Sequence, residues 1–292
     1  MATTTTTVTM PIYAVGDAGY RLWGKAWHDA MVAAGCTQVF SDIDLDAMIM
    51  PTTSGQMVTG SRIYSFDDSL HATHPLFVKL EWGRGNSSQP TNGFKLQISI
   101  GWQHDSGVLA GDVFSQFLAT HRELTEIGEI VVTRYDAGIS LWTNTTSTST
   151  AGFLIERTSL SGTVVGDGVS QLVFGTDVNA VTATGLNVAG RCADHLVHNV
   201  WGSNVLSGYD APIMAGYSTS PDADGKVPLY PFFSYGAYDP LRGVVGVSTA
   251  AVGANKRFTG SFNGVDGTYR TVPGSYSALG NGNRLTFLVE DI

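Results

Sequence analysis

Two pairs of histidines, each spaced as His-x-x-His, come nearest in type and spacing to a metal site. They are His71 with His74 and His195 with His198. A catalytic zinc site needs a third protein ligand and, for hydrolysis, a general base such as the glutamate of an HExxH helix. Neither segment supplies one, and Pro75 directly after His74 breaks the helical spacing of the first pair. We therefore interpret all four as turn or surface histidines and expect no bound metal.

Other short motifs of chemical interest are incomplete. Residues 222–225 (DADG) begin like a calcium-binding loop, but the acceptor glutamate further along is missing, so we interpret them as an acidic turn. The serines at 170 and 218 lack the second glycine of a GxSxG nucleophile elbow. The glycine pairs at 166–168 and 280–282 suit turns and lack the context of a phosphate loop. We expect no cofactor and no enzymatic activity, although carboxylates that converge only in the fold would leave a polysaccharide hydrolase open.

A late cluster of aromatic residues is the remaining candidate for ligand binding. Its members, punctuated by prolines at 228 and 231, are Tyr230, Phe232, Phe233, Tyr235 and Tyr238. Aromatic faces can form a platform for a carbohydrate, such as a glycan of a host surface. A strand that packs in a core or against another subunit is the interpretation we favour, because aromatic residues are also enriched in such contacts.

Composition narrows the class of protein. The chain has 292 residues, a formal net charge of −9, only 14% charged residues and 35 glycines. Its acidity and its lack of a basic stripe argue against nucleic-acid binding. We expect neither a signal peptide nor a membrane span, because no suitable apolar stretch is present. Cys36 and Cys192 show no pairing pattern; we favour reduced thiols, and a disulfide between them stays open.

The best helix candidate spans residues 20–35, YRLWGKAWHDAMVAAG. At helical spacing it has two adjacent apolar rows and one polar side. One row is Trp23, Trp27 and Met31, the other is Leu22, Ala26, Ala30 and Ala34, and the polar side is Arg21, Lys25, His28 and Asp29. Two tryptophans one turn apart require a sheet to cover them. We predict that Trp23, Trp27 and Met31, together with Trp82 on a strand, anchor the core.

The ends of this helix are predicted from single residues. Asp17 is a plausible N-cap, and Gly35 stands where a left-handed residue would end the helix. Gly24 lies in the interior, at a cost of about 1 kcal/mol relative to alanine. Packing rather than helix propensity must therefore hold the helix in place.

The sequence pattern of the rest of the chain predicts short strands joined by turns. Residues 76–82 (LFVKLEW) and 94–102 (FKLQISIGW) alternate between apolar and polar positions and predict a hairpin. Residues 38–50 predict a half-buried strand or an irregular connection, and 67–73 a helical turn that ends before Pro75. Further strands are predicted at 61–66, 108–118, 129–135, 139–142, 152–157, 171–174, 200–206, 229–235, 241–247, 256–262 and 284–290. The fold class is therefore mainly β (α+β), an antiparallel β-sandwich-like domain with one N-terminal amphipathic helix packed on it.

We divide the chain into an N-terminal arm, residues 1–15, and a single β-rich domain, residues 16–292. The threonine-rich arm has strand propensity but little apolar area, so we expect it to be ordered only where a neighbouring subunit supplies a sheet edge. A frayed tail is the alternative. The polar tract at 143–152 would be the place for a further division, but its short length and flanking strands favour a hairpin loop.

The order of several segments resembles a family of virion structural proteins from tailed bacteriophages, usually encoded among the tail and baseplate genes. The segments are YRLWG at 20–24, AAG at 33–35, IYSFDD at 63–68, HPLFVKLEWG at 74–83, FLIER at 153–157, LYPF at 229–232 and LTFLVE at 285–290. The resemblance runs from residue 20 to the end of the chain. It implies an assembly component without known catalysis and supplies no functional residues.

Three hypotheses follow, in order of preference. The first is a non-enzymatic virion protein in the tail tip, the baseplate or an appendage attached there, which binds copies of itself and other tail proteins. The second is a receptor-binding tail protein that uses the aromatic cluster at 230–238 to hold a host surface glycan. The third is a polysaccharide hydrolase. We expect a protein of the virion that assembles in the host cytoplasm.

Overall fold

The computed structural model describes most of the chain. The described residues are 3–53, 57–84, 93–110, 114–121, 123–135, 138–144, 152–158, 169–175, 186–191, 197–201, 206–207, 223–234, 240–248, 252, 256–262, 265–271 and 283–291. They form a mainly β structure whose sheets are antiparallel except for one parallel pair, β16 with β19, and the helix α1 packs on sheet near the N-terminus. The predicted fold class is confirmed.

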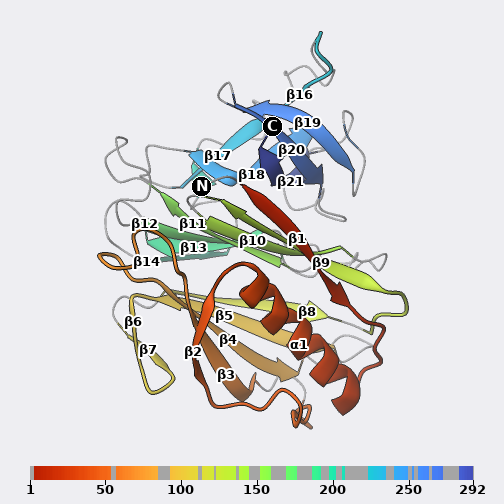
Figure 1. Cartoon of the computed structure of the whole chain (residues 1–292), viewed down its shortest axis with the longest axis vertical. Helices are drawn as coiled ribbons and strands as arrows, with labels where there is room; N and C mark the ends of the chain where they lie inside the picture. Colours follow the sequence, from red (N-terminus) through yellow and green to blue (C-terminus); the bar gives the residue numbers. More distant parts are fainter. Residues whose placement is uncertain are drawn as a thin grey trace.

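Three sheets lie one above another (Figure 1). The first sheet contains, in spatial order, β1 (Thr4–Met10), β9 (Gly128–Tyr135), β10 (Gly138–Asn144), β11 (Gly152–Thr158), β12 (Val169–Gly175), β13 (Leu186–Arg191) and β14 (Val197–Trp201). The second contains β2 (Thr37–Ser41), β3 (Met57–Ser65), β4 (Phe77–Arg84), β5 (Phe94–Gly101) and β8 (Phe114–His121). The third contains β15 (Leu206–Ser207), β17 (Tyr230–Ser234), β18 (Pro240–Ser248), β21 (Asn283–Asp291), β20 (Val265–Thr271), β19 (Arg257–Phe262) and β16 (Val227–Pro228). A small ribbon joins β6 (Gln103–Asp105) and β7 (Val108–Ala110).

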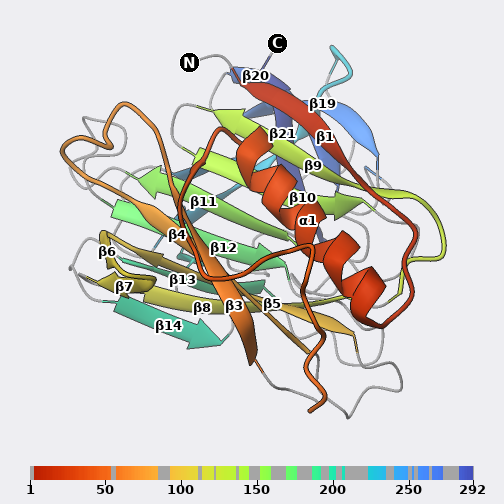
Figure 2. The ribbon, with the colours of Figure 1, turned by 60° about the horizontal axis from the view of Figure 1, so that its bottom comes forward.

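Helix α1 (Asp17–Ala33) fills one side of the space between the first two sheets (Figure 2). On the opposite side β8 lies directly against β12, β13 and β14, so the two sheets close on each other there. Trp23 packs on Phe94 of β5 with ring centroids 5.2 Å apart, and Trp27 stacks on Phe153 of β11 at 5.9 Å. The two tryptophans therefore face different sheets, and the helix joins them into one core.

The helix begins three residues earlier than predicted and ends at Ala33. Gly16 holds the N-cap position, while Asp17 lies in the first turn, where its carboxylate accepts a hydrogen bond from the Met50 N–H. The C-terminus is as predicted, because Gly35 has a φ of +74°. The Gly35 N–H donates to Val32 O and the Cys36 N–H to Met31 O, which closes the last turn in a Schellman motif.

Residues 44–50, here called the strap, run antiparallel along the outside of the helix. Arg21 Nε donates to Met48 O at 3.0 Å, and Lys25 pairs with Asp46. Together with the hydrogen bond between Asp17 and Met50, these contacts are spaced four residues apart on the helix and two residues apart on the strap. Between residues 48 and 50 this ratio suits the geometry, since four helical residues rise about 6 Å and two extended residues span about 6.6 Å. Residues 44–47 form a turn, in which the Ala47 N–H donates to Asp44 O. The predicted strand or irregular connection at 38–50 is thus the short strand β2 followed by this strap.

The strap also explains Gly24. A Cβ atom there would lie 2.5 Å from Met48 Cε, and the Trp82 indole nitrogen is close by. Met48 is buried in the notch that the glycine leaves on the helix surface. The helix therefore gives up propensity at Gly24 and gains the packing of Met48. Leu22, which we predicted in an apolar row, lies on the exposed side of the helix instead.

The N-terminal segment is paired within its own chain, so our expectation that it would be ordered only on a neighbour's sheet edge is wrong. β1 runs antiparallel to β9 from the Thr4↔Arg134 pair to the Met10↔Gly128 pair, and a bridge between Tyr13 and Leu124 continues the pairing. Met10 and Tyr13 are buried in the main core. Propensity alone could not show that β9 of the same chain offers an open edge. Removing residues 2–15 would take two core side chains away.

The predicted hairpins agree with the structure in their pairing. β4 and β5 are neighbours, and Leu76, Val78, Leu80 and Trp82 are buried while the residues between them are partly exposed. β10 and β11 are neighbours too, so the polar tract at 143–152, of which 145–151 lie outside the described residues, connects adjacent strands of one sheet. The predicted strand at 108–118 is two strands, β7 and β8, and that at 200–206 covers parts of β14 and β15. β6, β13, β16 and β20 were not predicted.

The third sheet docks on the first through a buried carboxylate. Glu156 of β11 accepts a hydrogen bond from the Tyr135 hydroxyl at 2.6 Å and one from the Gly243 N–H of β18 at 2.9 Å. Arg270 of β20 and Glu129 of β9 form a second link at 3.2 Å. Gly243 allows the close approach, because a Cβ atom there would overlap the Tyr135 hydroxyl and a methyl group of Leu154.

Replacing Gly243 with alanine should therefore destabilise the protein. The added methyl must push the Tyr135 hydroxyl off Glu156 or separate the two sheets, and overpacking of this kind costs about 1–3 kcal/mol. Urea unfolding followed by tryptophan fluorescence would measure the loss. An unchanged midpoint would show that the third sheet does not dock through this contact.

Candidate functional site

The four residues predicted as structural anchors all lie in the core. Trp23, Trp27 and Met31 project from α1 between the first two sheets, and Trp82 projects from β4 toward the helix. All four side chains are fully buried. They shape the scaffold and are inaccessible to a ligand.

The aromatic cluster is described only in part. Tyr230, Phe232 and Phe233 belong to the backbone of β17, which pairs with β15 and β18 and has a bulge between Pro231 and Phe233. Their side chains, and Tyr235 and Tyr238 altogether, lie outside the described residues. The strand assignment agrees with the prediction, and the glycan-platform hypothesis remains a prediction.

The histidine pairs do not come together as ligands where the structure describes them. His71 and His74 lie in the turn after β3; His71 approaches Ser65, and His74 Nδ1 contacts Thr73 Oγ1 at 3.0 Å. His198 belongs to the backbone of β14, and His195 lies outside the described residues. Within the described ranges no group of three or more His, Cys, Asp or Glu residues could hold a metal ion. In the acidic turn, Asp224 is exposed and Gly225 has a φ of +79°.

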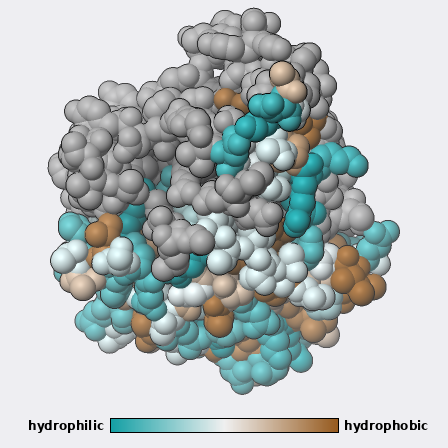
Figure 3. Space-filling model, turned by 45° about the horizontal axis from the view of Figure 1, so that its top comes forward, coloured by the Kyte–Doolittle hydropathy of each residue, from teal (hydrophilic) through white to brown (hydrophobic). Residues whose placement is uncertain are grey.

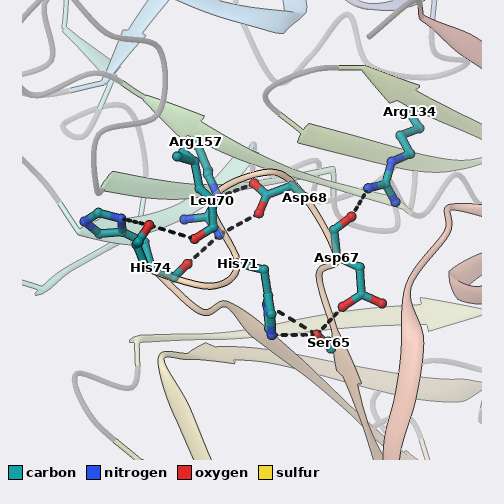
Figure 4. Close-up of polar contacts among 9 residues, drawn as sticks. Ser65, Asp67, Asp68, Leu70, His71, His74, Arg134 and Arg157 are labelled. Carbon is teal, nitrogen blue, oxygen red and sulfur yellow. Dashed lines mark hydrogen bonds and ion pairs between the residues drawn. The ribbon is translucent and has the colours of Figure 1, made fainter.

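A polar cluster that we did not predict surrounds the turn that follows β3, residues 67–74, here called the turn (Figure 4). Its centre is Arg157 of β11, whose side chain is only 1% exposed and whose partner Asp68 is 6% exposed. Arg157 Nε donates to Asp68 Oδ2 at 2.6 Å, and Nη2 donates to Asp68 Oδ1 at 3.2 Å and to His74 O at 2.7 Å. One arginine thus fixes both ends of the turn to the first sheet.

A second arginine strengthens the same junction. Arg134 of β9 donates from Nη1 to Ala34 O at 2.7 Å and from Nη2 to Asp67 O, so it ties the end of the helix to the turn. Its guanidinium lies 5.4 Å from the ring centroid of Phe66, and that of Arg157 lies 5.8 Å from the same ring. Phe66 is buried against two cations, a favourable arrangement for an aromatic face.

Ser65, His71 and Asp67 have the residue types of a catalytic triad, but their geometry does not match one. In a triad the histidine accepts from the serine and donates to the acid. Here Ser65 Oγ donates to Asp67 Oδ1 at 2.5 Å, while both His71 nitrogens stand 3.4 Å from Oγ. Ser65 is also buried. These side chains therefore brace the turn and do not form an activated nucleophile.

The contacts of the Asp67 carboxylate in this turn lower its pKa. Partial burial raises it, but hydrogen bonds from Ser65 and Thr37 and the charges of His71 and Arg134 outweigh burial, so the pKa falls below its ordinary value of 3.8. A carboxyl whose pKa is lower in the folded state favours folding above its unfolded pKa. That contribution disappears as the pH falls through the folded pKa.

We therefore expect acid to loosen the turn. The free energy of unfolding should decline as the pH falls below 3.8, and Asp67→Asn should flatten that part of the decline because its side chain cannot ionise. Urea titrations of both proteins between roughly pH 2.5 and 6 would show the difference. Parallel curves would mean that Asp67 titrates alike in the folded and unfolded chains.

The cluster joins two of the segments that carry the resemblance. Asp68 ends the segment IYSFDD, and Arg157 ends the segment FLIER. They are 89 residues apart in the chain, and no local pattern in the sequence pairs them. The signal available beforehand was a pair of charged residues, Glu156 and Arg157, directly after the apolar run at 153–155. Charged side chains on a strand that is buried need polar or charged partners.

Large apolar side chains also stand on the surface. Among the described residues, those at least 40% exposed are Ile12, Leu22, Val32, Val39, Ile49, Val108 and Ile127. On the face shown in Figure 3, hydrophobic residues gather at the margin on the side where β1 ends and β9 begins. Among the described strands, β1 and β2 are terminal in their sheets, each with one neighbouring strand. Apolar side chains beside open strand edges are suited to binding other protein surfaces.

No protein-family model matches the chain, and no curated protein sequence matches it. Within the described residues, no helix has the length and apolarity to cross a membrane.

Proposed function

We propose that this protein is a non-enzymatic structural component of a tailed-phage virion, located in the tail tip, the baseplate or an appendage attached there. It binds copies of itself and neighbouring tail proteins. The observation that carries this proposal is the set of large apolar side chains exposed on the described surface, of which Val39 lies on the terminal strand β2 and Ile12 directly after the terminal strand β1. On a chain with only 14% charged residues, such side chains suit contacts between subunits.

The polar side chains near the turn support the same role. Arg157, Arg134 and Asp68 bind the turn, the helix end and the first sheet to one another. A scaffold braced in this way can present edges and loops in fixed positions, which is what an assembly component needs. The resemblance to virion proteins of tailed phages points to the same class of function.

Purified particles test the proposal. Phage from the source culture would be separated on a density gradient, washed in high salt and digested for mass spectrometry. We expect peptides of this chain in a constant ratio to the known tail proteins across the particle peak. Its absence from washed particles would refute the proposal. A bacterial surface polymer that is shortened by the isolated protein would favour the hydrolase hypothesis.

A further inference from the structure

We propose that residues 4–13, the paired part of the N-terminal segment and from here on called the arm, can leave β9 of their own chain. They then pair with β9 of a second copy, so that two copies exchange arms. This inference rests on the proposed assembly function, because it names one contact through which copies join. The arm comprises β1 and the bridge at Tyr13, and it lies at the edge of the first sheet (Figure 2).

The arm is held by contacts that a second copy can supply equally well. Its seven residues in β1 each pair with one residue of β9, and Thr5 Oγ1 lies 3.3 Å from Thr133 Oγ1. Most of its side chains are exposed or partly exposed, and only Met10 and Tyr13 are buried. Because both copies carry the same β9 and the same core, exchange preserves these contacts and changes only the hinge and the new interface.

The hinge is the short connection between the arm and the helix, residues 14–16. It begins after Tyr13, whose N–H and C=O both bond to Leu124, and it ends at Gly16, whose carbonyl accepts from the Tyr20 N–H. Gly16 has a φ of +150° and open space around the position of a Cβ atom. A change of backbone direction there can move the arm while α1 stays in its core.

Apolar side chains mark the place where two copies would meet. Ile12 is 55% exposed and Ile127 is 72% exposed. The Met10↔Gly128 and Tyr13↔Leu124 pairs place both at the same end of the β1–β9 ladder, next to the hinge. When two arms cross between copies, this end of each copy faces the other. The new interface therefore covers side chains that a single copy leaves in water.

Cysteine pairing between different molecules tests the exchange. In a background with Cys36→Ala and Cys192→Ala, one variant carries Thr5→Cys and another carries Thr133→Cys. The two are mixed at high concentration, incubated and then oxidised. A disulfide between them can form only when the arm of one copy lies on β9 of the other, so we expect a linked dimer on a non-reducing gel.

A matched pair serves as the control. Thr259 and Thr268 are also threonine partners in antiparallel register, but they belong to the tight β19–β20 hairpin. Separate variants with Thr259→Cys and Thr268→Cys should give no linked dimer. The pair Thr7→Cys with Val131→Cys lies two residues along the same β1–β9 register and repeats the main test. Absence of a linked dimer in both arm mixtures would overturn the proposal.

The proposed interface predicts a second result in the same cysteine-pairing assay. Ile127→Ser should lower the yield of linked dimer about tenfold, because an apolar side chain is lost from each copy. Val108→Ser, at an apolar position on β7 that is 65% exposed, should leave the yield unchanged. If the mixtures give no dimer while washed particles contain the protein, exchange is refuted and the virion role stands. A linked dimer from a protein absent from particles would refute the virion role.

Discussion

Replacing Trp27 with alanine should lower the free energy of unfolding by about 3–5 kcal/mol and give poorly soluble protein. The indole is fully buried and stacks on Phe153 of the first sheet with an interplanar angle of 22°. Its removal leaves a cavity where the helix meets that sheet, and the neighbouring contact between Trp23 and Phe94 cannot close it because it faces the second sheet. Chemical denaturation followed by circular dichroism would measure the loss.

Two controls make the result specific. Val32→Ala, on the exposed side of the same helix, should change stability by no more than about 0.5 kcal/mol. Trp27→Phe keeps an aromatic ring for Phe153 and should retain much of the stability. A Trp27→Ala protein with an unchanged melting temperature would show that the helix does not join the two sheets as described.

Replacing Asp68 with alanine should cost about 3–5 kcal/mol, because the buried guanidinium of Arg157 would lose its only carboxylate among the described contacts. The backbone oxygen of His74 would remain as an acceptor, but it carries no compensating charge. Thermal unfolding of the variant would measure the loss, and proteolysis would show whether the turn at 67–74 opens first.

The double variant Asp68→Leu with Arg157→Met separates two contributions to the loss of stability: the lost attraction of the ion pair and the penalty for leaving the Arg157 charge buried without its partner. It should recover most of the stability lost by Asp68→Ala, because no charge stays buried. Asp46→Ala, which breaks the exposed pair with Lys25, should change stability by less than about 1 kcal/mol. Equal losses at Asp68 and Asp46 would contradict the structural role of the buried pair.

The sequence was most informative where structure repeats at short range. Two tryptophans and a methionine at helical spacing predicted the helix and its buried side, and alternation over 76–82 predicted β4 and its pairing with β5. The N-cap was wrongly assigned to Asp17 because an aspartate often caps a helix; in the structure Gly16 holds that position and the Asp17 carboxylate binds the strap at Met50. Local chemistry alone cannot distinguish these two uses of an aspartate.

Contacts between distant segments could not be predicted. The Thr5–Thr133 contact joins residues 128 positions apart, and strand propensity says nothing about which edge a threonine-rich strand will find. The bracing of the turn needed Arg157 and Arg134 to come from two strands of another sheet. The sequence showed that the interior glycine of the helix lowers helix propensity. It did not show why a glycine is needed there, which is that Met48 of the strap packs where a Cβ atom would lie.

A cryo-EM reconstruction of purified particles from the source phage tests the central claim most directly. We expect this fold in repeated copies at the tail tip, the baseplate or an appendage attached there, with the end of the β1–β9 ladder that carries Ile12 and Ile127 in contact with a neighbouring protein. A reconstruction in which every tail density is accounted for by other proteins would contradict the claim. So would copies whose exposed apolar side chains all face solvent.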